Sequence, residues 1–125
     1  MVLVATLLAF TLQTTSVDTG GQTAWRDAAI HQQAAVIQDQ KLAKDGDVRA
    51  MREYGLRLWQ GRDVKRDREA ALGWFYEAAI RNDAPSMYLL GRAFERGEGV
   101  GKDLKLADYW TARAFENGYT EDGGR

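Results

Sequence analysis

The sequence matches itself at an offset of 36 residues. When 47–83 is aligned with 83–119, nine of the 37 pairs are identical, whereas average residue usage would give roughly two. The identical pairs are Asp47/Asp83, Met51/Met87, Gly55/Gly91, Gly61/Gly97, Val64/Val100, Asp67/Asp103, Ala71/Ala107, Trp74/Trp110 and Ala78/Ala114. A tandem period of this length is typical of stacked two-helix units. The sequence therefore predicts an all-α fold, an α/α solenoid with repeats at 47–82 and 83–119.

Each repeat is expected to begin with a helix that buries one stripe of residues. The stripes follow the i, i+3, i+4, i+7 spacing of a buried helical face and comprise Met51, Tyr54, Gly55 and Leu58, then Met87, Leu90, Gly91 and Phe94. Asp47 is a favourable N-cap for the first of these helices. After a turn at 61–66 or 97–102, Asp67 or Asp103 is expected to cap the second helix of the repeat.

The second helices carry small and aromatic residues at their predicted inward positions. These are Ala70, Ala71, Trp74, Phe75, Ala78 and Ala79, then Leu106, Ala107, Trp110, Ala114 and Phe115. Gly55 and Gly91 lie in mid-helix, where glycine costs up to about 1 kcal/mol relative to alanine. We therefore expect a neighbouring helix to approach each glycine at near-backbone distance, and both tryptophans to be core residues.

A further helix and its turn are expected at 23–46. Ala35 and Ala43 stand one period before Ala71 and Ala79, so this helix corresponds to the second half of a repeat. We predict that it forms an N-terminal capping half-repeat.

Residues 1–22 are predicted to be an export leader and linker. Residues 2–12 form an apolar run that is too short to cross a bilayer, and Thr14 and Ser16 follow with the spacing of a cleavage site. No basic residue precedes the run, so a buried helix of an upstream repeat and a mis-assigned start codon are the alternatives. A periplasmic or secreted location is expected, with the cytoplasm as the alternative. At the other end, 120–125 is expected to be a disordered tail.

Charge and cysteine content exclude several classes of protein. Lys and Arg number 17 against 18 Asp and Glu, and a formal charge of -1 argues against a nucleic-acid binder. No cysteine is present, which excludes disulfides, thiolate metal sites and cysteine nucleophiles. The length of 125 residues fits one small domain.

The repeats resemble those of the Sel1-like repeat family, relatives of the tetratricopeptide repeats. The family unit is similar to A-x-x-x-L-G-x-x-Y, then G-x-G-V-x-x-D-x-x-K-A, then W-x-x-x-A-A-x-x-G. The second repeat matches it at Leu90, Gly91, Phe94, Gly97, Gly99, Val100, Asp103, Lys105, Ala107, Trp110, Ala114 and Gly118. The first repeat matches it at Ala50, Tyr54, Gly55, Leu58, Gly61, Val64, Asp67, Glu69, Ala71, Trp74, Ala78 and Ala79.

The first repeat departs from the family pattern at two turn positions. Asp63 and Asn82 stand where glycines are expected, but both residue types tolerate left-handed backbone angles. Many secreted members pin each repeat with a disulfide, which cannot form here. The resemblance implies an α/α solenoid of Sel1-like helix-turn-helix repeats that serves as an adaptor, with no catalytic residues to carry over.

Residues with catalytic chemistry are sparse in this chain. His31 is the only histidine, which excludes paired-histidine metal sites. The glycines at 97, 99 and 101 follow a predicted helix instead of a strand and lack the lysine and hydroxyl of a phosphate loop. We therefore expect no enzymatic activity, no cofactor and no metal.

A basic cluster surrounds the turn of the first repeat. It consists of Arg62, Lys65, Arg66 and Arg68. The cluster is either a solvated loop or a docking patch for an acidic partner or phospholipid head groups.

A second candidate surface is the inner curve of the solenoid. Arg49, Arg52 and Tyr54, with Arg92 and Glu95 from the next repeat, are expected to line it. Concave solenoid faces bind peptides or protein loops, with arginine and aromatic anchors. The predicted partner-binding residues are thus Arg49, Arg52, Arg62, Lys65, Arg66 and Arg92.

The predicted function is a non-enzymatic adaptor for protein–protein interaction in the bacterial cell envelope. The predicted partner is another protein or a peptide. Nucleic acid is not an expected partner, membrane contact is expected only through the N-terminal leader, and a homodimer would cover an open end of the short solenoid. An inhibitor or immunity-type protein that blocks a toxin or enzyme is the alternative, and a hydrolase is a second, for which the sequence offers no nucleophile beside a base.

Overall fold

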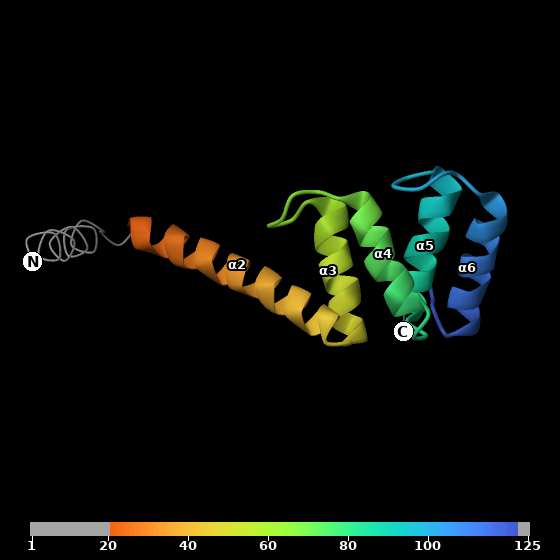
Figure 1. Cartoon of the computed structure of the whole chain (residues 1–125), viewed down its shortest axis with the longest axis horizontal. Helices are drawn as coiled ribbons and strands as arrows, with labels where there is room; N and C mark the ends of the chain where they lie inside the picture. Colours follow the sequence, from red (N-terminus) through yellow and green to blue (C-terminus); the bar gives the residue numbers. More distant parts are fainter. Residues whose placement is uncertain (1–20, 123–125) are drawn as a thin grey trace, which may run out of the picture. The chain divides into compact units, whose positions relative to one another are not determined.

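The computed structural model describes residues 21–122, and in this range it contains five helices and no strand (Figure 1). The helices are α2 (Gly21–Lys44), α3 (Val48–Gln60), α4 (Arg68–Ala79), α5 (Ala84–Arg96) and α6 (Leu104–Glu116). The predicted all-α fold is confirmed. Two predicted segments lie wholly or partly outside the described residues. These are residues 1–20 of the leader predicted at 1–22 and residues 123–125 of the tail predicted at 120–125.

The chain divides into two compact units within α2, at the bond between Ala34 and Ala35. The described part of the first unit is the helical stretch 21–34, in which every side chain from residue 24 onward is exposed. The second unit contains the rest of α2 and the helices α3 to α6.

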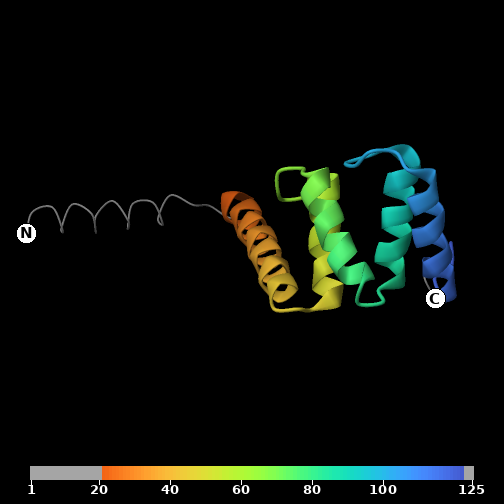
Figure 2. The same ribbon diagram turned by 45° about the vertical axis from the view of Figure 1, so that its right-hand side comes forward.

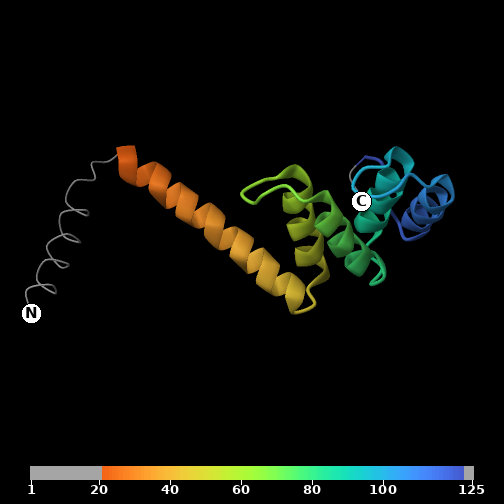
Figure 3. The same ribbon diagram turned by 45° about the horizontal axis from the view of Figure 1, so that its top comes forward.

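Two helical hairpins make up most of the second unit. Helix α3 packs on α4 and α5 packs on α6, while α4 joins the hairpins by packing on α5. Figure 2 and Figure 3 show these four helices side by side in chain order from two further directions. The end of α2 contributes Val36 and Ala43 to the buried core, and Asp39 accepts a 2.8 Å hydrogen bond from Arg57 of α3.

An aspartate caps the N-terminus of each of the helices α3 to α6. The carboxylates of Asp47, Asp67 and Asp103 accept hydrogen bonds from backbone N–H groups in the first turn at 2.9 to 3.1 Å, as predicted. Asp83 caps α5 in the same way, at 3.2 Å from the Ser86 nitrogen. These bonds satisfy backbone donors that have no partner inside the helix.

The turns reuse a left-handed backbone at corresponding positions of the two repeats. Asp63 has a φ of 61° where the second repeat has Gly99 at 73°, and Asn82 has a φ of 69° where it has Gly118 at 90°. Asp63 and Asn82 are the non-glycine residues with positive φ in the described chain. Asp63 and Asn82 thus adopt the left-handed backbone angles that their residue types were expected to tolerate.

The mid-helix glycines mark close helix contacts. A Cβ atom placed on Gly55 would lie 2.6 Å from the Phe75 ring and 3.3 Å from the carbonyl oxygen of Ala71. One placed on Gly91 would overlap the Thr111 hydroxyl and lie 3.1 Å from the carbonyl oxygen of Ala107. Both helix pairs thus approach at near-backbone distance, as predicted.

Both repeat tryptophans pack against the core, with different neighbours. Trp110 is buried and meets the Tyr76 ring edge-on at 6.0 Å. Trp74 is half-buried and meets Tyr54 edge-on at 5.8 Å. Tyr54 is buried in this contact, as its place in the first stripe predicted, so its ring is not an exposed anchor for a partner.

Two residues of α6 that were predicted to face inward are exposed. Leu106 is 40% exposed and Phe115 is 45% exposed. In α4 the apolar residues Leu72, Phe75 and Ala79 are buried in the core, but no described helix follows α6 to cover it in the same manner. The stripe pattern identified the helix correctly and overestimated how much of it is covered.

A contact of the first repeat is replaced by a different kind of contact at the corresponding positions one period later. Arg52 of α3 donates a 2.7 Å hydrogen bond to Asp83 at the start of α5. One period later the two positions hold Tyr88 and Tyr119, whose rings stack with centroids 4.3 Å apart. An ion pair and an aromatic stack thus occupy corresponding places in the fold.

Candidate functional site

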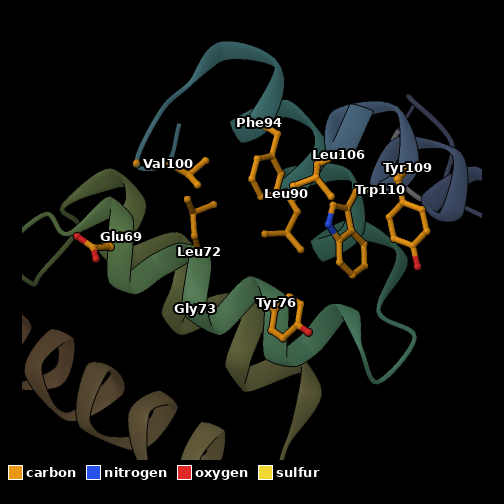
Figure 4. Close-up of a pocket in the computed structure, with 11 residues that line it drawn as sticks. Glu69, Leu72, Gly73, Tyr76, Leu90, Phe94, Val100, Leu106, Tyr109 and Trp110 are labelled. Atoms are coloured by element: carbon orange, nitrogen blue, oxygen red, sulfur yellow. The ribbon is translucent and has the colours of Figure 1, made fainter. Parts of the chain in front are cut away.

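An open apolar groove of about 750 Å³ lies between α4, α5 and α6. It is lined by Glu69, Leu72, Gly73, Tyr76, Leu90, Phe94, Gly99, Val100, Leu106, Tyr109 and Trp110. Figure 4 shows side chains of all three helices facing this space. Its lining is predominantly hydrophobic, as a bound protein segment would need.

Helical spacing explains why these side chains converge. Positions 69, 72, 73 and 76 follow the i, i+3, i+4, i+7 spacing of one face of α4, and 106, 109 and 110 share one face of α6. Leu90 and Phe94 lie one turn apart on α5 and, together with Val100 of the following turn, close the groove between the two walls.

The groove has a buried floor and an exposed aromatic rim. Leu72, Leu90 and Trp110 are buried, whereas Tyr76 and Tyr109 are 50% and 49% exposed. Tyrosine presents an apolar ring and a polar hydroxyl, which suits it to a surface that is sometimes wet and sometimes covered. The rim therefore has the character of a protein-binding surface.

Gly73 leaves one wall of the groove without a side chain. It lies in the middle of α4, and no atom lies within 4 Å of the place its Cβ would occupy. Gly55 and Gly91, in contrast, are needed because another helix fills that space. Gly73 thus carries the conformational cost of a helical glycine with no packing gain inside the described chain.

The two repeats differ in how this region is filled. Leu90 stands one period after Tyr54, whose ring contacts Trp74 in the first repeat. The shorter side chain of Leu90 leaves room beside Trp110, which contacts Tyr76 and Tyr109 at the rim instead. The groove therefore depends on the sequence of the second repeat as well as on the fold.

Glu69 is the single charged residue that lines the groove. It lies in the first turn of α4 and has no ion-pair partner within residues 21–122. The remaining lining is apolar, aromatic or glycine. A ligand that fits would combine apolar groups with a positive charge near the Glu69 end.

In the predicted basic cluster, one side chain forms an ion pair and three do not, within the described part of the chain. Arg62, Lys65 and Arg66 are exposed, and no ion pair holds them in the described part of the chain. Arg68 pairs with Glu98 at 3.3 Å and lies over the Trp59 ring at 5.0 Å. It therefore connects the first repeat to the turn of the second.

The other predicted partner-binding residues lie apart from this turn. Arg49 is exposed, and Arg52 is held in its ion pair with Asp83. Arg92 lies 3.4 Å from Glu95 and lines a hollow of about 190 Å³ with Trp59. The structure does not bring the six basic residues into one site, and their part in binding a partner stays a prediction.

The groove itself was missed from the sequence. Tyr76 and Tyr109 were not considered, and Leu106 was assigned to the core. A signal was present in Gly73, a glycine in mid-helix to which the repeat comparison gave no packing role. Only the coordinates show that the space beside it is open.

The described residues contain neither a candidate metal site nor a candidate membrane span. From residue 21 to 122, no group of three or more His, Asp or Glu side chains lies close enough to hold a metal ion. No helix in the same range is long and apolar enough to span a bilayer.

The fold and the groove define an all-α repeat protein with an open apolar groove. The sequence pattern of the Sel1 repeat matches residues 48–83 and 84–119, and the chain belongs to the Sel1 repeat family. The predicted family and solenoid fold are confirmed. Proteins of this kind are typically scaffolds for protein–protein interaction, and the fold is generally non-catalytic.

Two solved structures are similar to this chain. One is a Sel1 repeat protein from Oxalobacter formigenes, with 36% identity and a TM-score of 0.65 over 66% of this chain and 63% of that one. The other is a protective antigen of uropathogenic Escherichia coli strains that displays an SLR fold, with 31% identity and a TM-score of 0.64 over 71% of this chain and 21% of that one. This chain thus corresponds to only part of each. No curated protein sequence gives a significant match.

Proposed function

We propose that this protein is a non-enzymatic adaptor that binds another protein or a peptide through the groove between α4 and α6. The observation that carries the proposal is the uncovered hydrophobic lining, with Tyr76, Leu106 and Tyr109 exposed around a buried floor. Apolar surface removed from water stabilises a complex by roughly 25 cal/mol per Å² before the costs of association. Aromatic residues are frequent anchors of such interfaces.

The basic turn is proposed as a second, weaker contact. Arg62, Lys65 and Arg66 are exposed without an ion pair in the described chain, so they attract an acidic surface at little desolvation cost. Charges at the rim of an interface mainly raise the rate of association and give it salt dependence. Reversing these charges should slow binding without abolishing it.

We further propose that the protein acts in the cell envelope. The support for this location is the apolar run at 2–12, followed by small residues suited to cleavage. Intact-mass measurement of the protein from cells tests it. A processed N-terminus in the periplasmic fraction is expected, and full-length protein confined to the cytoplasm would rule the location out.

Site-specific photocrosslinking in cells tests the adaptor proposal. A photoreactive phenylalanine analogue is placed at Tyr76 or Tyr109 on the rim and, as a control, at the exposed Lys44 at the end of α2. Rim positions should yield discrete protein adducts that mass spectrometry can identify. The proposal fails if the rim positions give no adduct, or the same adducts as Lys44.

A further inference from the structure

The first half of α2 presents a second uncovered apolar surface. Trp25 is 60% exposed on a stretch, 21–34, whose side chains from residue 24 onward are all exposed. Trp25 and Ala29 fall on the same face of the helix as Val36 and Ala43, since the separations of 4, 7 and 7 residues are close to whole turns. Val36 and Ala43 are buried. The apolar face therefore continues along α2 beyond the part that is covered.

Gly73 indicates what kind of element fits the groove. At both close helix contacts of this molecule, a mid-helix glycine makes room for the facing helix: Gly55 lies against the Phe75 ring and the Ala71 carbonyl oxygen, and Gly91 lies against Thr111 and the Ala107 carbonyl oxygen. Gly73 is a mid-helix glycine with no such partner within the described residues. The stretch 21–34 supplies a small residue, Ala29, one turn after Trp25.

The charges of the two surfaces are complementary on the face that carries Trp25. Glu69 is the single charged residue of the groove lining, and the stretch 21–34 contains one basic residue, Arg26, and one acidic residue, Asp27. Arg26 lies about 100° around the helix from Trp25, whereas Asp27 lies about 160° from it, on the opposite face. Arg26 stands next to Trp25 in the sequence. An apolar anchor beside a positive charge is what the groove and its acidic end accept.

We propose that the groove of one copy binds the first half of α2 of a second copy, so that the protein forms a two-fold dimer by reciprocal exchange of this segment. The proposal names the partner of the groove and rests on its proposed function as a protein-binding surface. Trp25 lies against Tyr76 and Tyr109, and Ala29 crosses α4 at Gly73. Two reciprocal contacts double the buried area, which matters because stable interfaces bury about 1,200–2,000 Å².

Analytical ultracentrifugation of the full chain over a range of concentrations tests the proposal. A species of twice the 14.0 kDa chain mass is expected. Trp25→Glu removes the anchor and Gly73→Leu fills the groove, and each should weaken dimerisation by about tenfold or more. Both positions are exposed, so neither change is expected to unfold the protein, which circular dichroism verifies.

A matched control separates this contact from general loss of hydrophobic surface. Ile30 is 65% exposed on the same stretch, but it lies about 140° around the helix from Trp25. Ile30→Glu should leave the dimer intact. If it dissociates the dimer as strongly as Trp25→Glu does, the proposed docking face is wrong.

Mixing the two variants gives the decisive measurement. The Trp25→Glu copy keeps an intact groove and the Gly73→Leu copy keeps an intact α2, so an equimolar mixture should regain a dimer with one working contact. A mixture that stays monomeric, or a wild-type chain that is monomeric throughout, overturns the proposal. If the wild type is monomeric while Tyr76 still crosslinks to a different protein, self-recognition is wrong and the adaptor function stands.

Discussion

At the scale of single residues, glycines in the middle of helices occur in two opposite environments, a crowded helix contact and open space. Gly91 lies where Thr111 and the backbone of Ala107 leave no room for a methyl group. Gly73 lies where there is room for any side chain. The first glycine is explained by packing inside the molecule, whereas the second has no packing partner among the described residues and is accounted for only by the proposed docking of a second copy.

Alanine substitution should separate these two glycines. Gly91→Ala forces α5 and α6 apart and is expected to lower the free energy of unfolding by about 1–3 kcal/mol. In the monomer, Gly73→Ala meets open space and should raise it by about 0.5–1 kcal/mol, because alanine restricts the unfolded chain and favours the helix. Urea denaturation followed by circular dichroism measures both. Equal effects of the two changes would mean that the contact at Gly91 is misassigned.

At the scale of helices, the two repeats are joined by side chains that serve more than one element. Asp83 caps α5, accepts a hydrogen bond from the hydroxyl of the buried Ser86, and pairs with Arg52 of α3. Asp67 only caps its own helix. The same residue type at an N-cap therefore contributes differently to the stability of the fold.

We expect Asp83→Ala to cost more than Asp67→Ala. Loss of an exposed cap costs about 1 kcal/mol, whereas loss of Asp83 also leaves Ser86 and Arg52 without their partner, for a total of about 2–4 kcal/mol. Chemical denaturation of the two variants provides the comparison. Asp83→Asn keeps the cap and removes the charge, so it should fall between them, and equal losses for both alanine variants would contradict the assigned link.

The aromatic stack in the second repeat should make stability sensitive to alkaline pH. Burial, and then the neighbouring Tyr88 phenol, raises the pKa of Tyr119 above its usual value of about 10. The folded state therefore keeps a proton that the unfolded state loses, and this contribution is present below pH of about 10 and is lost as pH rises further. Unfolding by urea at several pH values should show a decline that Tyr119→Phe reduces. Tyr109→Phe, at an exposed phenol, is the control and should leave the decline unchanged.

At the scale of the whole molecule, the core ends differently at its two sides. The end of α2 supplies Val36 and Ala43, of which Ala43 packs with Ala50, Met51 and Ala78. On α6, the exposed Asp108 stands one period after the buried Leu72, whereas Thr111 lies beside Gly91 much as Phe75 lies beside Gly55 in the first repeat. Asp108 thus makes this face of α6 more polar than the corresponding face of α4.

Two N-terminal truncations should show which part of α2 contributes to the stability of the core. Among the described residues, removal of 1–34 takes away only exposed side chains, those of 24–34, and is expected to change the free energy of unfolding of the monomer by less than about 1 kcal/mol. Removal of 1–46 also uncovers Met51 and Ala78 and should cost about 2–4 kcal/mol. Thermal and urea unfolding of both proteins test this. Equal stability of the two would show that α2 does not belong to the core.

Much of the fold was predictable because its signals are local. The 36-residue period is visible in the sequence itself, and the aspartate caps and turn glycines depend on backbone geometry within a few residues. Even the departures at Asp63 and Asn82 could be interpreted, because both residue types adopt left-handed angles. The burial of Leu106 and Phe115 was predicted wrongly, since it depends on which helix lies opposite.

The amino-acid sequence alone determined the helices, their ends and their repeat, because these follow from spacing and from hydrogen bonds between near neighbours. Tertiary structure decided which apolar residues stay uncovered. Leu72, Leu90 and Trp110 come from three helices, and the groove exists only because they converge without filling the space between them. Arg52 and Asp83, 31 residues apart, likewise meet only in the folded chain. Packing at a distance, and not local pattern, therefore places the candidate site.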